Sequence, residues 1–200
     1  MLFRSPTIPD VNESHTPPPT KTVPYNSYEW HTSICIANRA QRLWPGDQRL
    51  EKIQFGIAVH EALSRIHTHV TPEEACTSVL RDGFITPTIF SRLEQAVHAA
   101  LQASIGTTTL LECISAPGTL KEKSLLTQSG TIRPDCVALF ATHIVVIDYK
   151  TGMPSAAHST QLREYCSVVK QIHTIPVEAY LLYIGENGSV VVEKLGKDVS

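Results

Sequence analysis

The sequence predicts an α/β domain, because segments with helical periodicity alternate with short β-branched segments along the chain. Residues 51–66 carry apolar side chains at helical spacing, which is typical of an amphipathic helix. Residues 143–150 form a β-branched run of strand length. The dipeptide Asn187-Gly188 tolerates the positive φ of a tight turn, so it indicates a hairpin near the C-terminus.

The same patterns predict the order of the elements. We expect helices at residues 51–69, 72–82, 87–104 and 156–172. We expect strands at residues 119–127, 131–140, 143–150, 177–184 and 189–194.

Length and composition favour one globular domain. The chain has 200 residues, and its 42% hydrophobic content suffices for a core. We expect residues 25–200 to form this domain. Residues 1–24 are rich in proline, serine and threonine, a composition typical of a flexible linker or tail.

Composition also excludes several classes of protein. No apolar run approaches the length of a membrane span and no secretory signal is present, so we expect a cytoplasmic protein without a membrane partner. The cysteines show no close pair, so we expect reduced, mostly buried thiols and no iron–sulfur cluster. They are Cys35, Cys76, Cys113, Cys136 and Cys166. The formal net charge of −2 excludes strong nonspecific DNA affinity of the whole domain.

The most informative segment is residues 133–152, which reads Arg-Pro-Asp, twelve residues, then Asp-Tyr-Lys-Thr-Gly. Asp148 and Lys150 are two apart in an expected strand, so their side chains point to the same side. Asp135 follows a proline, which cannot donate to a strand ladder and marks a strand start, edge or bulge. Only two residues separate the two expected strands, which predicts a hairpin that brings both carboxylates together.

Such a constellation meets the needs of phosphodiester hydrolysis. Two carboxylates can hold a hard divalent cation, which acidifies a bound water and polarises the phosphoryl group. The ammonium of Lys150 could orient the attacking water or stabilise the developing negative charge. The alternative is a surface ion pair between Asp148 and Lys150, which would contribute under about 1 kcal/mol.

A histidine accompanies the acidic pair on the first expected helix. His60 falls on the apolar side of this helix, and we expect it to project inward with Ile53 and Ile57. Gly56 would allow another backbone to approach closely. Imidazole is an acceptable ligand for manganese or for a magnesium site with mixed ligands. The alternative is a histidine satisfied within the core.

These residues together resemble the RecB-like branch of the PD-(D/E)XK nucleases, which is found at the C-termini of RecB and AddA helicase-nucleases. The resemblance covers about residues 50–185. It rests on Gly-x-x-x-His-x-x-Leu from Gly56, Glu122, Asp135, Asp-Tyr-Lys-Thr-Gly from Asp148, and Gln-x-x-x-Tyr from Gln161. It implies a restriction-endonuclease-like fold, with a central mixed sheet of four or five strands flanked by helices.

The resemblance also implies a role for each matching residue. His60, Asp135 and Asp148 would ligate Mg²⁺ or Mn²⁺, with the carbonyl of Tyr149 as a further ligand. Lys150 would be the catalytic lysine, acting beside the two aspartates.

Three further positions are candidates for a supporting role. Glu122 matches a family glutamate and could lie in the shell around the metal ligands, or it could be one charge of a solvated strand face beside Lys121 and Lys123. Gln161 and Tyr165 are four apart on an expected helix, so they share a face. They could reach the site or the nucleic acid, or form a polar cap over the sheet.

The leading hypothesis is a Mg²⁺- or Mn²⁺-dependent deoxyribonuclease domain that cleaves single-stranded DNA, as an exonuclease or endonuclease, in recombinational repair. A UvrD/Rep-type helicase, attached or associated, is expected to deliver the strand. The nearest positive groups are Arg133, Lys121, Lys123, Arg163 and Lys170. One alternative is a catalytically inactive nuclease-like DNA-binding or scaffolding module. Another is a free-standing phage-type recombination exonuclease, which would form a toroidal oligomer.

Overall fold

The central sheet is mixed, with strand order β3–β6–β7–β8–β9. It is seen in a computed structural model that describes residues 48–127 and 130–196, all within one compact unit, Cys35–Ser200. The expected linker, residues 1–24, and the expected start of the domain at residue 25 lie outside the described residues.

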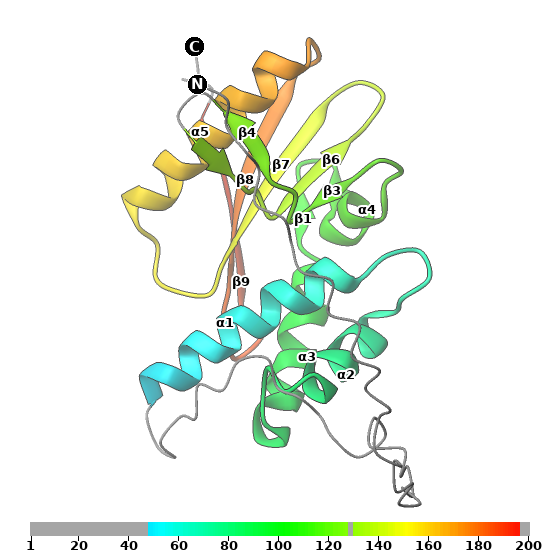
Figure 1. Ribbon diagram of the computed structural model, residues 1–200, viewed down its shortest axis with the longest axis vertical. Helices are drawn as coiled ribbons and strands as arrows, with labels where there is room; N and C mark the ends of the chain where they lie inside the picture. The colour runs from blue at the N-terminus through cyan, green and yellow to red at the C-terminus, as the bar shows by residue number, and fades with distance from the viewer. Residues whose placement is uncertain (1–47, 128–129, 197–200) are drawn as a thin grey trace, which may run out of the picture. The chain divides into compact units, whose positions relative to one another are not determined.

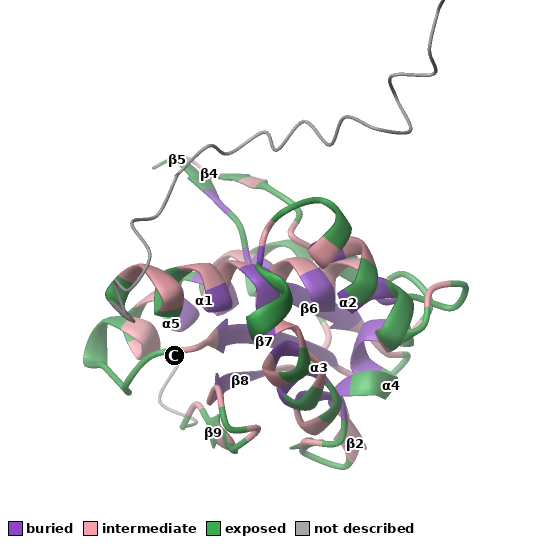
Figure 2. Ribbon diagram, turned by 90° about the horizontal axis from the view of Figure 1, so that it is seen from below, coloured by how far each residue is buried: buried purple, intermediate pink, exposed green. Residues whose placement is uncertain are grey.

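The strands of this sheet are β3 (Leu120–Lys121), β6 (Cys136–Leu139), β7 (Ile144–Lys150), β8 (Val177–Ile184) and β9 (Val190–Lys194). Strands β7 and β8 are parallel, whereas the other neighbours are antiparallel. The mixed sheet of four or five strands is therefore confirmed. Figure 2 shows buried residues concentrated in β6, β7 and β8, at the centre of the sheet.

One face of the sheet is covered by α5 (Ala156–Ile172), which connects the parallel strands β7 and β8 (Figure 1). The helix begins after Ser155, whose side chain accepts a hydrogen bond from the Ala157 N–H. Its apolar side packs in a buried cluster against Val146 and Leu181. The structure confirms the expected bounds of both this helix and β8.

The opposite face is covered by α1 (Gln48–Arg65), α2 (Pro72–Arg81), α3 (Pro87–Leu101) and α4 (Leu110–Ser115). Phe55 of α1 and Leu93 of α3 share this larger buried cluster with Tyr180 and Leu182 of β8. The two faces of β7 thus contact different helices, because strand side chains alternate. Ile147 and Tyr149 face α1, whereas neighbouring residues of β7 face α5.

The expected orientation of α1 was wrong in part. Ile53 is 47% exposed and Ile57 is only half-buried, so neither marks the face of the helix that enters the core. The buried face instead carries Phe55, Ala58, Val59, Ala62, Leu63 and Ile66. His60 lies at the edge of this face, with 30% of its side chain exposed, so it does not project into the core.

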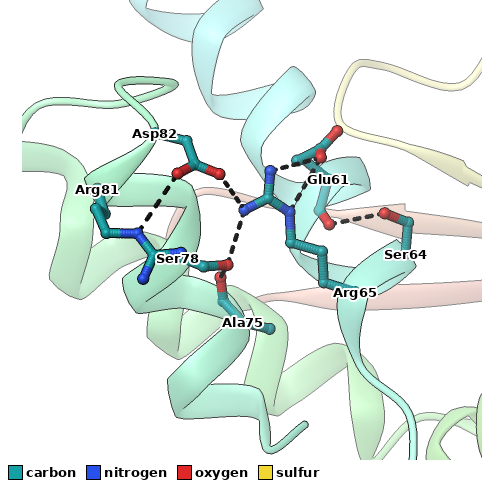
Figure 3. Close-up of polar contacts among 7 residues, drawn as sticks. All are labelled: Glu61, Ser64, Arg65, Ala75, Ser78, Arg81 and Asp82. Carbon is teal, nitrogen blue, oxygen red and sulfur yellow. Dashed lines mark hydrogen bonds and ion pairs between the residues drawn. The ribbon is translucent and has the colours of Figure 1, made fainter. Parts of the chain in front are cut away.

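The polar side of α1 joins it to α2 (Figure 3). The Arg65 guanidinium lies 2.7 Å from a carboxylate oxygen of Glu61 and 2.7 Å from one of Asp82. It also donates to Ser78 Oγ at 2.8 Å. Helix α1 ends at Arg65 rather than at residue 69, and His67 and Val70 pair in an isolated bridge before Thr71 caps α2.

Two expected strands are each divided in the structure. The segment 119–127 breaks between β3 and β4 (Leu125–Thr127), at Glu122, whose φ of 51° is left-handed. The segment 131–140 breaks between β5 (Gly130–Ile132) and β6, where Pro134 lacks the N–H that a ladder needs. Strands β4 and β5 pair with each other in a separate two-stranded sheet.

A short region before β3 was missed by the sequence prediction. It holds the hairpin of β1 (Ser104–Ile105) and β2 (Thr108–Thr109), followed directly by α4. The expected helix at 87–104 therefore ends earlier, at Leu101. Thr109 and Glu112 form a capping box at the start of α4, and the Thr-x-x-Glu spacing is the sequence signal that could have revealed it.

The expectation of buried thiols is confirmed for the described part of the chain. Cys76, Cys113, Cys136 and Cys166 are buried and form no disulfide, while Cys35 lies outside the described residues. None of the helices in residues 48–127 and 130–196 is both long and apolar enough to cross a membrane.

Candidate metal centre

The β6–β7 hairpin brings the two aspartates together. Its register pairs Cys136 with Ile147, which sets Asp135 beside Asp148 on the adjacent strand. The turn closes with a hydrogen bond from the Phe140 N–H to the His143 carbonyl, at 3.0 Å. Asp135 is 7% exposed and Asp148 is 2% exposed, and no other charged side chain in the described part of the chain is buried. Two buried carboxylates so close together require compensating charge.

Asp135 links the strands to α1. Its Oδ2 accepts a hydrogen bond from the Tyr149 N–H at 2.5 Å, and its Oδ1 lies 3.2 Å from His60 Nδ1. The His60 ring also meets the Tyr149 ring edge-on, with 5.7 Å between centroids. The side chain of Tyr149 is buried in the core. Its backbone is nevertheless part of the site, because its N–H donates to Asp135.

Glu122 lies on the other side of His60. Its Oε1 is 3.7 Å from His60 Nδ1, and its Oε2 is 3.1 Å from Arg133 Nε. Ligand atoms of His60, Glu122 and Asp135 all lie within 4.8 Å of one another. The left-handed backbone of Glu122 carries its side chain toward this group while its N–H still bonds the Asp135 carbonyl, at 3.0 Å. Glu122 is thus not one charge of a uniformly solvated strand face.

Lys150 is held between β7 and α5. Its Nζ lies 2.6 Å from Asp148 Oδ2 and donates to Gln161 Oε1 at 3.0 Å. The Gln161 amide in turn donates to the Tyr165 hydroxyl at 2.6 Å. Gln161 and Tyr165 therefore reach the site from one face of the helix and connect it to the lysine.

Charged side chains in the site shift one another's pKa values. Burial lowers the pKa of His60, but its hydrogen bonds to Asp135 and Glu122 and their charges outweigh this effect and raise the pKa to about 10. Burial, and then the charge of Asp135, raise the pKa of Asp148 to about 6, although Lys150 opposes the shift. Asp135 and Glu122 therefore stabilise positive charge at the position of His60.

The donor set fits a hard divalent ion. Asp148 Oδ2 is buried, and the Lys150 ammonium lies 2.6 Å from it. Carboxylate and imidazole groups suit Mg²⁺ or Mn²⁺, so the two aspartates, Glu122 and His60 are chemically suitable ligands. His60, Glu122 and Asp135 form the group whose ligand atoms lie within 4.8 Å of one another, and Asp148 lies outside this group but beside Asp135 on the next strand. These four residues could hold such an ion.

These side chains line one cleft, with a volume of about 940 Å³. All the side chains that the sequence singled out for the site line it, whereas Tyr149 lies behind it in the core. The lining consists of Gly56, Ile57, His60, Glu61, Ser64, Phe84, Glu122, Thr131, Ile132, Arg133, Asp135, Asp148, Lys150, Gln161, Glu164 and Tyr165.

Some lining residues were missed by the sequence prediction. Glu164 is three residues after Gln161 on α5, and this helical spacing could have identified it. Thr131 and Ile132 enter the cleft through the β4–β5 ribbon, for which the local sequence carries no comparable signal. Of the positive groups expected nearby, Arg133 lines the cleft, whereas Lys121 instead donates to the Ile66 carbonyl at the end of α1.

Comparison with known families agrees with this geometry. Residues 36–198 match the model of the PD-(D/E)XK nuclease superfamily. No curated protein matches the chain. The residues that give the superfamily its name are present as Pro134-Asp135 and Asp148-Tyr149-Lys150, the two aspartates lie side by side, and the mixed sheet flanked by helices is consistent with a restriction-endonuclease-like fold. The chain therefore belongs to the PD-(D/E)XK nuclease superfamily.

Proposed function

We propose that this domain is a metal-dependent deoxyribonuclease that hydrolyses phosphodiester bonds. The observation that carries the proposal is the arrangement of Asp135, Asp148 and Lys150 at one end of the β6–β7 hairpin, with Lys150 Nζ 2.6 Å from Asp148. Catalysis of this reaction depends mainly on positioning and on stabilisation of charge, and this group of residues can supply both.

His60, Asp135 and Asp148 would hold Mg²⁺ or Mn²⁺, with the Tyr149 carbonyl as a further ligand. A bound ion of this kind acidifies a coordinated water and offsets negative charge on the phosphoryl group. The pairing of the strands that sets Asp135 beside Asp148 and the contact of 3.2 Å between His60 and Asp135 support this ligand set. Glu122 lies close enough to His60 and Asp135 to join it or to orient the histidine.

Lys150 is the proposed catalytic lysine. Gln161 and Asp148 fix its ammonium from two sides, so the positive charge is oriented before substrate binds. From there it would orient the attacking water or stabilise the charge that develops on the phosphoryl oxygens. Tyr165 supports the lysine through Gln161.

We infer that the substrate is single-stranded DNA delivered by another module. The cleft is lined by five carboxylates but by only two groups of permanent positive charge in the described part of the chain, Arg133 and Lys150. With a net charge of −2, the domain would therefore gain little affinity from counterion release. A UvrD/Rep-type helicase, as in the RecB and AddA proteins that the chain resembles, would supply the strand during recombinational repair.

The decisive experiment is cleavage of end-labelled single- and double-stranded DNA with Mg²⁺, with Mn²⁺ and with a chelator. We expect metal-dependent cutting that falls about 100-fold or more in Lys150→Ala. Lys52→Ala is the matched control, because Lys52 is exposed on α1 and does not line the cleft.

The other outcomes separate the alternatives. Metal binding without cutting would point to a domain that works only when a helicase delivers the strand. Absence of metal binding would favour an inactive binding or scaffolding module. A toroidal oligomer in size-exclusion chromatography, with cutting at duplex ends, would favour a phage-type recombination exonuclease.

A further inference from the structure

Helix α1 approaches the end of β7 at Gly56. A Cβ atom added at Gly56 would lie 2.5 Å from Thr151 Oγ1, whereas real Cβ atoms essentially never come within 3.0 Å of another heavy atom. The next nearest atoms, Cβ and Cγ2 of Thr151, would be 3.7 and 4.0 Å away. The close approach is therefore possible because Gly56 has no side chain. The atom with which a methyl group at this position would clash is the hydroxyl oxygen of Thr151.

Glycine inside a helix requires a reason, because it weakens the helix relative to alanine. Gly56 lies in the middle of α1, and its φ is not in the left-handed region, so its backbone conformation does not require glycine. The narrow space between α1 and Thr151 is the feature that requires glycine at this position.

The two residues flank the proposed catalytic groups. Gly56 precedes His60 by four residues, about one helical turn, and both line the cleft. Thr151 directly follows Lys150. The position of α1 against Thr151 consequently influences how far His60 lies from Asp135, at present 3.2 Å, and from Tyr149.

We propose that Gly56 and Thr151 form a positioning contact that sets the distance between α1 and the end of β7, and thereby places His60 against Asp135. This inference rests on the proposed nuclease function. Ordinary van der Waals contact begins at 3.4 Å, so a methyl group at position 56 requires a shift of about 0.9 Å in α1 or in the Thr151 side chain. A misplacement of about 1 Å can cost about 100-fold in rate.

The test is a set of variants at the two positions. We expect Gly56→Ala to remain folded but to lose at least about tenfold in cleavage, and to need severalfold more Mn²⁺ for half-maximal activity. Gly56→Ala combined with Thr151→Ala should recover most of both losses, because the alanine at position 151 removes the oxygen that clashes. Gly56→Ala combined with Thr151→Val is the matched control, and it should not recover, because valine keeps the branched shape.

A structural readout keeps the test independent of catalysis. In the metal-free protein, nuclear Overhauser contacts between the His60 and Tyr149 rings should weaken in Gly56→Ala and return in the variant with Thr151→Ala. If the wild-type protein neither cuts DNA nor binds Mn²⁺, the nuclease proposal fails. The ring contacts still test whether Gly56 and Thr151 set the position of His60.

The inference is overturned in either of two cases. In the first, Gly56→Ala matches wild type in metal requirement and ring contacts. In the second, the double variant with Thr151→Ala is no better than Gly56→Ala. If Gly56→Ala does not fold, the double variant with Thr151→Ala becomes the test. The proposal requires this double variant to fold and to recover the ring contacts. A double variant that stays unfolded contradicts the proposal.

Discussion

His60 Nδ1 lies 3.2 Å from Asp135 Oδ1, so an imidazole from the first described helix meets a carboxylate that directly precedes β6, 75 residues later in the chain. This contact joins the α1 layer to the sheet at the proposed metal centre. It also keeps His60 protonated in the absence of metal, since hydrogen bonds to Asp135 and Glu122 raise its pKa to about 10 despite the opposing effect of burial.

Metal binding should therefore release a proton. At pH 7 to 8 metal-free His60 carries a proton, because its pKa is about 10, and coordination requires the neutral ring. Affinity should rise with pH toward this value, and it should fall as pH drops through about 6, where Asp148 takes up a proton. Calorimetry of Mn²⁺ binding in two buffers of different ionisation enthalpy measures the release, which His60→Gln should abolish. Equal heats in both buffers would contradict the prediction.

Gln161→Met should slow cleavage by about tenfold while changing KM little. The substitution keeps the length of the side chain but removes the oxygen that accepts from Lys150 at 3.0 Å. A hydrogen bond to a charged group contributes roughly 1.5–3 kcal/mol, and about 1.4 kcal/mol corresponds to tenfold in rate. Steady-state kinetics separate kcat from KM. Thr160→Ala is the control, because Thr160 is exposed on the same helix, and an equal loss in both variants would argue for a general effect on α5.

Arg133→Ala should weaken DNA binding without weakening metal binding. Arg133 is 63% exposed, lines the cleft and holds Glu122 at 3.1 Å. Removing Arg133 deletes a positive charge that could contact a DNA phosphate. It also removes the partner of Glu122, which could then approach a bound metal ion more closely. We expect KM for single-stranded DNA to rise severalfold, with a smaller dependence on salt. Arg163→Ala removes the same charge from an exposed position outside the cleft lining, and a similar rise in KM there would contradict a specific role for Arg133.

Arg65→Ala should destabilise the fold. Arg65 joins α1 to α2 through Glu61, Ser78 and Asp82, and its side chain is only 24% exposed. Loss of this network should lower the free energy of unfolding by about 1–3 kcal/mol, as measured by urea denaturation.

The control for this change is Arg81→Ala. The side chain of Arg81 is 75% exposed and its Nε lies 3.5 Å from Asp82, so we expect a change within about 0.5 kcal/mol. If the two variants were equally stable, the network at Arg65 would not contribute to the packing of α1 on α2.

Much of the site was predictable from local sequence. The alternation of side chains along a strand places Asp148 and Lys150 on one face, and the short connection before β7 predicts the hairpin that brings Asp135 beside Asp148. Helical spacing likewise places Gln161 and Tyr165 on one face of α5. These features depend on neighbours in the chain, so the sequence indicates them directly.

Other features depend on packing between distant segments. Apolar spacing identified α1 but could not show that Ile57 and His60 border a cleft while Phe55 enters the core. The left-handed backbone of Glu122 and its approach to His60 likewise required the structure.

The sequence by itself therefore determined the α/β class, the β6–β7 hairpin and the types of residue available for metal and phosphate chemistry. Tertiary structure alone decided which face of α1 meets the sheet, how closely Gly56 approaches Thr151, and which carboxylates surround His60. The physical reason is that periodicity describes a single element, whereas the distance between two elements follows from the side chains that both must bury together.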